Sequence, residues 1–148
     1  MNYSTASKNL EELQLDSSAS VERSELTVSE PVIRRYFETF NDQNFQATAS
    51  LFAAEGALYP PFEDALVGCE AIAGYLQKEA KGMKALPQQE TFQVLDNGNT
   101  EYKVGGKVLT AMFGVNVAWQ FVLDPESKIL SLRIKLLAAL EELLSLKR

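Results

Sequence analysis

An alternation of apolar and polar residues dominates the second half of the chain. Between Val115 and Leu123 the odd-numbered positions carry Val, Val, Trp, Phe and Leu, whereas the even-numbered ones carry Asn, Ala, Gln and Val. A period of two is typical of a strand with one apolar face. Gly114 separates this strand from a long one over residues 100–113. Within that long strand Gly105-Gly106 predicts a bulge or sharp bend, which would curl the sheet.

The first half of the chain has helical spacing instead. One broad apolar helix face is formed by Val32, Ile33, Tyr36, Phe37 and Phe40. A second helix carries Phe45, Ala49 and Phe52 on one face, and Gly56 is suited to a left-handed C-terminal residue. A short strand is expected over residues 57–59, and a third helix from about Cys69 to Lys81.

The remaining segments complete an antiparallel meander. A strand over residues 91–96 leads into Asn97-Gly98, a strong hairpin signal, and the last strand spans Ile129–Leu137. The order of elements predicts an α+β fold in which a bent antiparallel sheet and about three helices enclose a cone with a pocket. We divide the chain into a polar, loose extension over residues 1–28 and one domain over residues 29–148, whose end, residues 138–147, can form a tail helix.

Composition excludes several classes of function. The chain of 148 residues has a formal net charge of −6, which argues against binding of nucleic acid or anionic membranes. It has no apolar run that could span a bilayer and no signal-peptide pattern, so we expect a cytoplasmic protein without membrane insertion. Histidine is absent, which removes the commonest general base and the usual zinc ligands.

Cys69 is the single cysteine, so no internal disulfide can form. It precedes or opens a helix, where the positive end of the helix dipole favours a thiolate. We therefore expect Cys69, if it is exposed, to join two chains through a disulfide under oxidising conditions, which would couple redox state to ligand uptake.

Two aromatic side chains have both a packing and a ligand-binding interpretation. Trp119, the only tryptophan, lies in the middle of an apolar strand face, where an indole N–H needs an acceptor. It either donates to a backbone carbonyl in the core or points into a cavity toward a ligand oxygen. Tyr36 is central to the first helix face, with its hydroxyl either at the rim of the core or aimed into a pocket.

Several segments resemble a known family. They are Ala49–Phe62 (ASLFAAEGALYPPF), Val67-Gly68, Gly82–Pro87 (GMKALP), Gly106–Val108, Met112–Gly114, Asn116–Phe121 (NVAWQF) and Ile134–Leu144 (IKLLAALEELL). The order of elements resembles the nuclear-transport-factor-2-like fold, and these motifs are similar to the C-terminal domain of the cyanobacterial orange carotenoid protein. The resemblance covers residues 30–148. The chain therefore resembles the stand-alone homologues of that domain, which bind and transfer carotenoids.

The resemblance implies a ligand and a set of residues that bind it. A tyrosine on the first helix and a tryptophan on the sheet would bond the keto oxygen of a ketocarotenoid, canthaxanthin or echinenone, and these fall on Tyr36 and Trp119. A carbonyl oxygen has two lone pairs and accepts from two donors. The implied tunnel lining is Phe40, Val67, Met83, Val108, Thr110, Met112, Phe113, Phe121 and Ile134. The implied function is photoprotective, through carotenoid carriage, transfer to helical carotenoid-binding N-terminal-domain proteins, and quenching of singlet oxygen or excitation energy.

A small enzyme of the same superfold, such as an isomerase or dehydratase, is the alternative. Such an enzyme needs a carboxylate with a raised pKa on an apolar pocket face. Glu79 on the third helix is the best candidate, since the inward strand positions carry no acid. We therefore expect no catalytic site and no metal site.

A homodimer that shares one carotenoid is the expected loaded form. A domain of this length has a radius of gyration of about 15 Å, so the far ring of the pigment must protrude. A second copy would cover that ring with its own Tyr36 and Trp119, which favours a pigment with keto groups on both rings. The dimer surface is expected on the outer sheet face, where Leu109, Ala118 and Val122 interrupt the polar positions.

Overall fold

The structure is a computed structural model, and it describes residues 28–137. The N-terminal extension up to residue 27 and the expected tail helix over residues 138–147 lie outside the described residues. The elements are α1 (Pro31–Asn41), α2 (Phe45–Ala49), β2 (Phe52–Tyr59), β3 (Leu66–Val67), α3 (Cys69–Glu79), β4 (Lys84–Val94), β5 (Thr100–Leu109), β6 (Gly114–Leu123) and β7 (Ile129–Leu137).

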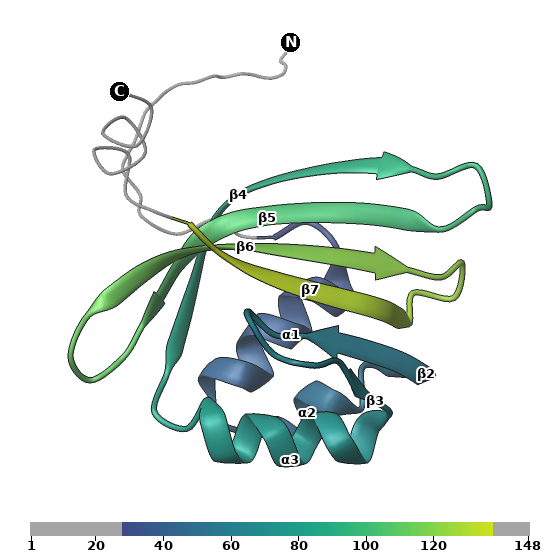
Figure 1. The fold of residues 1–148 in the computed structure, drawn as a ribbon. Coiled ribbons are helices and arrows are strands. Elements are labelled where there is room, and N and C mark those ends of the chain that lie inside the picture. The colour runs from purple at the N-terminus through teal and green to yellow at the C-terminus, as the bar shows by residue number, and fades with distance from the viewer. Residues whose placement is uncertain (1–27, 138–148) are drawn as a thin grey trace, which may run out of the picture.

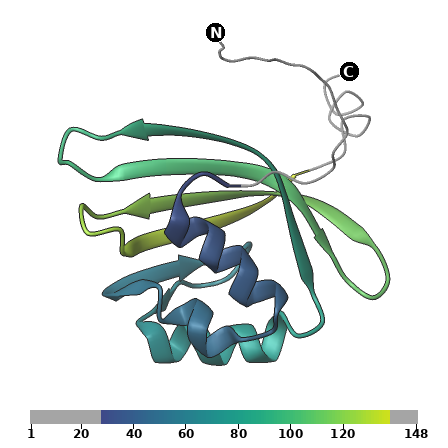
Figure 2. The ribbon, with the colours of Figure 1, turned by 180° about the vertical axis from the view of Figure 1, so that it is seen from behind.

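One curved sheet of six strands carries the fold, in the order β3-β2-β7-β6-β5-β4. The helices lie on its concave side, with α1 across the sheet and α3 at the far side of the cone (Figures 1 and 2). The expected curved sheet and helices are confirmed. In strand direction the sheet differs from the expectation at one pair, because β2 runs parallel to β7, so the sheet is mixed rather than wholly antiparallel. This pairing joins strands distant in sequence, which hairpin signals do not reveal.

The concave face is built from rows of side chains that cross the strands. Trp119 on β6 is directly opposite Val104 on β5 and Ile134 on β7. In the next row Phe121 is opposite Tyr102 and Leu132. The alternation in β6 is confirmed, because its odd-numbered residues from 117 to 123 are buried and the even-numbered ones between them are not. The core therefore lies between these rows and the buried face of α1.

A bulge curls the sheet where the glycine pair predicted a bend. The pairing of β4 with β5 shifts between Pro87 and Gln89, opposite Gly105 and Gly106. A Cβ atom at Gly106 would collide with the carbonyl oxygen of Leu86, so only glycine permits this approach. β4 is an edge strand, so it tolerates Pro87 at the bulge, although proline cannot donate a backbone hydrogen bond. The strand therefore begins at Lys84, before the start at residue 91 that the sequence predicted.

The second helix and its C-terminus are corrected by the structure. α2 ends at Ala49, and Phe52 and Gly56 belong to β2, which starts five residues before the strand expected at residue 57. Gly56 is not in a left-handed conformation. It is required because a Cβ atom there would lie 2.6 Å from the carbonyl oxygen of Ile129 on the neighbouring strand. Close approach of two strands, rather than a helix end, explains this glycine.

We expect Gly106→Ala to lower the free energy of unfolding by about 1–3 kcal/mol or more, because the new methyl group meets backbone atoms that cannot rotate away. Gly105→Ala is the matched control, since its Cβ would lie 3.3 Å from the flexible side chain of Gln89. Urea denaturation measures both. Equal stability of the two variants would contradict the role given to Gly106.

Candidate functional site

Tyr36 lies at the centre of an aromatic cluster between α1 and the sheet. Its side chain is 1% exposed. The centroid of its ring is 5.3 Å from those of Phe37 and Phe121 and 6.0 Å from that of Phe40. The α1 face that the sequence predicted is confirmed, and it places this phenol against β6. The Tyr36 ring is packed in the core, but its hydroxyl does not lie at the rim as the packing interpretation expected, because it is buried as well.

The hydroxyl of Tyr36 has no hydrogen-bond partner although it is fully buried. An unpaired buried polar group costs about 1–3 kcal/mol, so such a group in a native protein requires an explanation. Burial raises the pKa of this hydroxyl above its ordinary value. The phenol therefore stays protonated through the physiological pH range and remains a hydrogen-bond donor directed into an apolar interior.

Trp119 faces the same cluster from the sheet. It is 2% exposed, and its ring meets that of Phe37 edge to face at 4.9 Å. In residues 28–137 the buried side-chain polar atom that lacks a partner is the Tyr36 hydroxyl, and the Trp119 indole nitrogen does not share that state. Phe37 thus contacts both Tyr36 and Trp119, and the two potential donors approach one region of the core from opposite layers.

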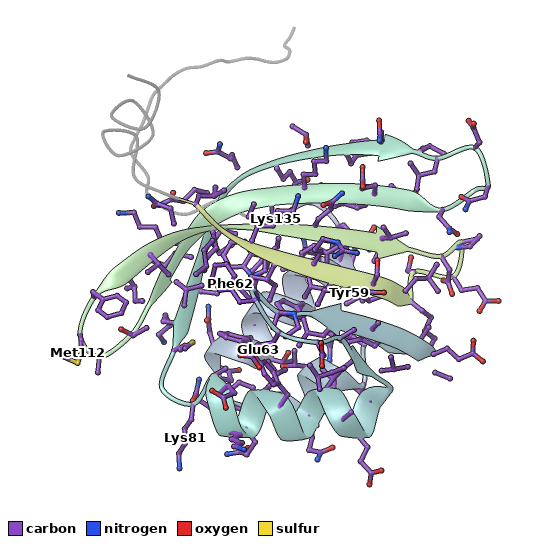
Figure 3. All side chains as sticks on the ribbon, viewed as in Figure 1. Tyr59, Phe62, Glu63, Lys81, Met112 and Lys135 are labelled. Atoms are coloured by element: carbon purple, nitrogen blue, oxygen red, sulfur yellow. The ribbon has the colours of Figure 1, made fainter. Side chains whose placement is uncertain are left out.

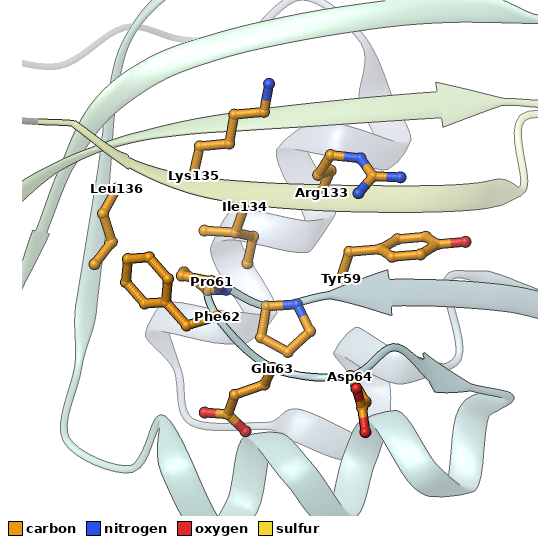
Figure 4. A pocket seen from close by; sticks show the side chains of 10 residues that line it. Tyr59, Pro61, Phe62, Glu63, Asp64, Arg133, Ile134, Lys135 and Leu136 are labelled. Atoms are coloured by element: carbon orange, nitrogen blue, oxygen red, sulfur yellow. The ribbon is translucent and has the colours of Figure 1, made fainter.

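A pocket of about 640 Å³ opens where β2 ends beside β7. It is lined by Tyr59, Pro60, Pro61, Phe62, Glu63, Asp64, Arg133, Ile134, Lys135 and Leu136 (Figure 4). Its wall residue Ile134 packs against the core and is the direct cross-strand neighbour of Trp119. The pocket therefore reaches the edge of the Trp119 row from the protein surface.

The pocket has an apolar side and a polar side. Phe62 and Leu136 lie together on one side, and Tyr59 and Arg133 on the other (Figure 4). The Arg133 guanidinium sits 4.1 Å from the centroid of the Tyr59 ring, a cation–π contact. Phe62 is 93% exposed and has a φ of 65°, which is uncommon for an aromatic residue. Phe62 belongs to one of the segments that carry the family resemblance, but it was not among the predicted lining residues.

The structure brings some of the expected lining residues together and separates others. Tyr36, Phe40, Trp119 and Phe121 share one cluster. Met83, Val108 and Ile134 are partly buried against that cluster. The Phe37 ring contacts the rings of both Tyr36 and Trp119. The sequence placed Phe37 only on the apolar face of the helix, because helical spacing does not show which residue lies between the helix and the sheet.

The other expected lining residues lie at the surface. Val67 on β3 is 61% exposed, Phe113 is 62% exposed, and Met112 is 86% exposed at the tip of the β5–β6 connection (Figure 3). Thr110 is held in that connection by its hydroxyl, which donates to the Phe113 carbonyl at 2.9 Å. Contact of each residue with a ligand stays a prediction.

The described residues offer little support for a catalytic carboxylate, a metal site or a disulfide. Glu79 is exposed on α3 and does not line the pocket. Across residues 28–137 no three metal-ligating side chains gather in one place. Cys69 is the first residue of α3, half-buried, with its thiol donating to the Phe52 carbonyl at 3.8 Å. Its part in a disulfide stays a prediction.

Residues 28–132 match the nuclear transport factor 2 (NTF2) domain. The chain belongs to the NTF2 domain family. It is 37% identical over 123 residues to the orange carotenoid-binding protein of Limnospira maxima and 36% identical over 125 residues to that of Synechocystis. These matches cover 80% and 82% of this chain but 39% of each relative, so the chain spans about two fifths of the curated relatives it matches.

A solved structure extends the likeness to three dimensions. The canthaxanthin-binding orange carotenoid protein of Anabaena has a TM-score of 0.74 and 35% identity, covering 84% of this chain and 41% of that one. The NTF2-like fold expected from the sequence is thereby confirmed. So is the resemblance to one domain of the orange carotenoid protein. In the part of the chain that the structure describes, no helix has the length and apolar character needed to cross a membrane.

We expect Tyr36→Phe to stabilise the ligand-free protein by about 1–3 kcal/mol, because it removes a buried hydroxyl that has no partner and keeps the ring. Urea denaturation of the ligand-free protein measures the change. Tyr59→Phe is the matched control, since this half-buried tyrosine is not among the unpaired buried groups and should gain nothing. A loss of stability in Tyr36→Phe would mean that its hydroxyl already has a partner.

Proposed function

We propose that the protein binds a ketocarotenoid whose keto oxygen accepts hydrogen bonds from the Tyr36 hydroxyl and the Trp119 indole N–H. The observation that carries the proposal is the buried, unpaired Tyr36 hydroxyl. A ligand carbonyl would supply the missing acceptor and leave the apolar surroundings dry. The carotenoid bound by the Anabaena relative, which carries keto groups, supports this choice of ligand class.

The pocket supports a path for the rest of the pigment. The polyene would leave the aromatic cluster past Ile134 and emerge between Phe62 and Leu136. Apolar contact along this path contributes about 25 cal/mol per Å² of buried surface, which favours a long hydrocarbon over a small polar substrate. Because Tyr36 is fully buried, entry of the ring requires packed aromatic side chains to move.

The biological role that follows is photoprotection. A protein that holds a ketocarotenoid would carry the pigment, quench singlet oxygen or excitation energy, and transfer it to a helical carotenoid-binding partner. The similarity to orange carotenoid-binding proteins supports this role rather than an enzymatic one.

We expect Tyr36→Phe and Trp119→Phe each to reduce pigment yield and shift the absorption of any residual pigment to the blue. Each substitution removes one donor, and a hydrogen bond of this kind contributes about 0.5–1.5 kcal/mol. Expression in a canthaxanthin-producing host, followed by absorption spectroscopy, measures both effects. Tyr59→Phe, at the pocket but outside the proposed donor pair, should bind as the unaltered protein does. Unchanged yield and spectrum in both donor variants would refute the assignment.

We also propose that the loaded protein is a homodimer that shares one pigment. The described residues expose more apolar surface at the pocket than on the outer sheet face that the sequence favoured. Phe62 is 93% exposed and Leu136 47%, whereas Leu109 is 38% exposed and Ala118 and Val122 are half-buried. Two pockets facing each other would enclose the protruding ring and favour a pigment with a keto group at both ends.

Light scattering combined with pigment quantitation tests the shared ligand, with an expected result of one pigment per two chains. Cys69→Ser should dimerise equally if the pigment, rather than a disulfide, joins the chains. A monomeric complex with one pigment per chain would contradict the proposal.

A further inference from the structure

A second apolar surface, remote from the pocket, lies on the concave face near the β4–β5 hairpin. We call it the Phe92 patch; it consists of Phe92, Val94 and the ring of Tyr102. Phe92 is 61% exposed and Val94 70%, and the Phe92 ring stacks on Tyr102 at 5.3 Å. Phe92 on β4 is opposite Tyr102 on β5, which is opposite Phe121 on β6, so Phe92 lies at the edge-strand end of that row.

The described chain begins beside this patch. Val28 is 2% exposed, and its carbonyl accepts from Arg34 at 2.7 Å. The Ser29 backbone N–H donates to the Glu90 carboxylate at 3.1 Å, and the Ser29 hydroxyl bonds the same carboxylate. Glu90 and Phe92 are two residues apart on one face of β4, about 7 Å along the strand. The first described residues, which residues 1–27 precede in the sequence, therefore lie next to the Phe92 patch.

We propose that the N-terminal segment covers the Phe92 patch, with Leu26 as its apolar anchor. Leu26 is three residues before Ser29, and three residues span at most about 10 Å, which is enough to reach Phe92 from the Glu90 contact. The attachment at Ser29 makes this contact intramolecular, so its effective concentration is high.

A second copy of the chain fits the patch less well. A patch of three residues is small compared with the roughly 1,200 Å² or more that stable interfaces bury. A twofold contact would also bring the bordering Glu30 and Glu90 close to the same carboxylates of the partner copy, where like charges repel. The proposal therefore commits to the chain's own segment.

A double-mutant cycle on the full-length, pigment-free chain tests the contact through thermal denaturation midpoints. Leu26→Ser and Phe92→Thr remove the two sides of the contact, and threonine keeps β propensity at the edge strand. Each single substitution should lower the midpoint by about 2–4 °C. The double variant should fall well short of the sum, because either change alone already breaks the contact. The stacking of Phe92 on Tyr102 is lost in the presence and absence of Leu26, so it cancels in the cycle.

Leu26→Ser combined with Val67→Thr is the matched control, since Val67 is as exposed as Phe92 but lies on β3 at the other edge of the sheet. These two shifts should add. Additive shifts for Leu26 with Phe92, or no shift for Leu26→Ser, would overturn the proposal. A midpoint that rises with protein concentration and loses that dependence in Phe92→Thr would assign the patch to a second copy and overturn it as well. No pigment is involved, so failure here leaves the proposed ketocarotenoid site unaffected.

Discussion

The central constraint in this protein is a hydroxyl that the fold buries without a hydrogen-bond partner. Tyr36 projects from α1 into a cluster of aromatic rings, and its oxygen finds no acceptor there. Replacing the hydroxyl with hydrogen would be favourable for the ligand-free fold, since the ring alone satisfies the packing. A group that costs stability in one state is explained most simply by a second state in which it is paired. A carbonyl in the same apolar space provides that state, and the low local dielectric strengthens the bond.

The rest of the fold determines where that carbonyl can be. The bulge opposite Gly105-Gly106 curls the sheet, so that the Trp119 row faces α1 instead of running past it. Termination of β2 at Tyr59 leaves the end of β7 unpaired on its β2 side, where the pocket opens beside Ile134. The curved sheet thus places Trp119 in the interior and the opening of the pocket at the end of β7.

Much of the site was predictable because its signals are local. The alternation over residues 115–123 fixed which face of β6 is buried, and the helical spacing around Tyr36 fixed the face of α1. The pairing of Tyr36 with Trp119 came from family resemblance, since no periodicity shows which helix residue meets which strand residue.

The remaining features depend on contacts between distant segments. Gly56 was assigned to a helix end, but it is required by the approach of Ile129 more than seventy residues later. The parallel pairing of β2 with β7 has the same origin. The alternation of residues also could not predict that Met112 and Phe113 are exposed. Alternation applies only within a strand, and β5 ends at Leu109.

The single tryptophan allows the central claim to be tested at one atom. The indole N–H of Trp119 gives the only indole resonance in a ¹⁵N-correlated NMR spectrum of the chain. On loading with canthaxanthin this resonance should move downfield as the bond to the keto oxygen forms, and it should not do so with β-carotene, which has the same polyene but no keto group. The same indole shift with both pigments, or no shift with canthaxanthin bound, would contradict the assignment of Trp119 as a donor to the ligand.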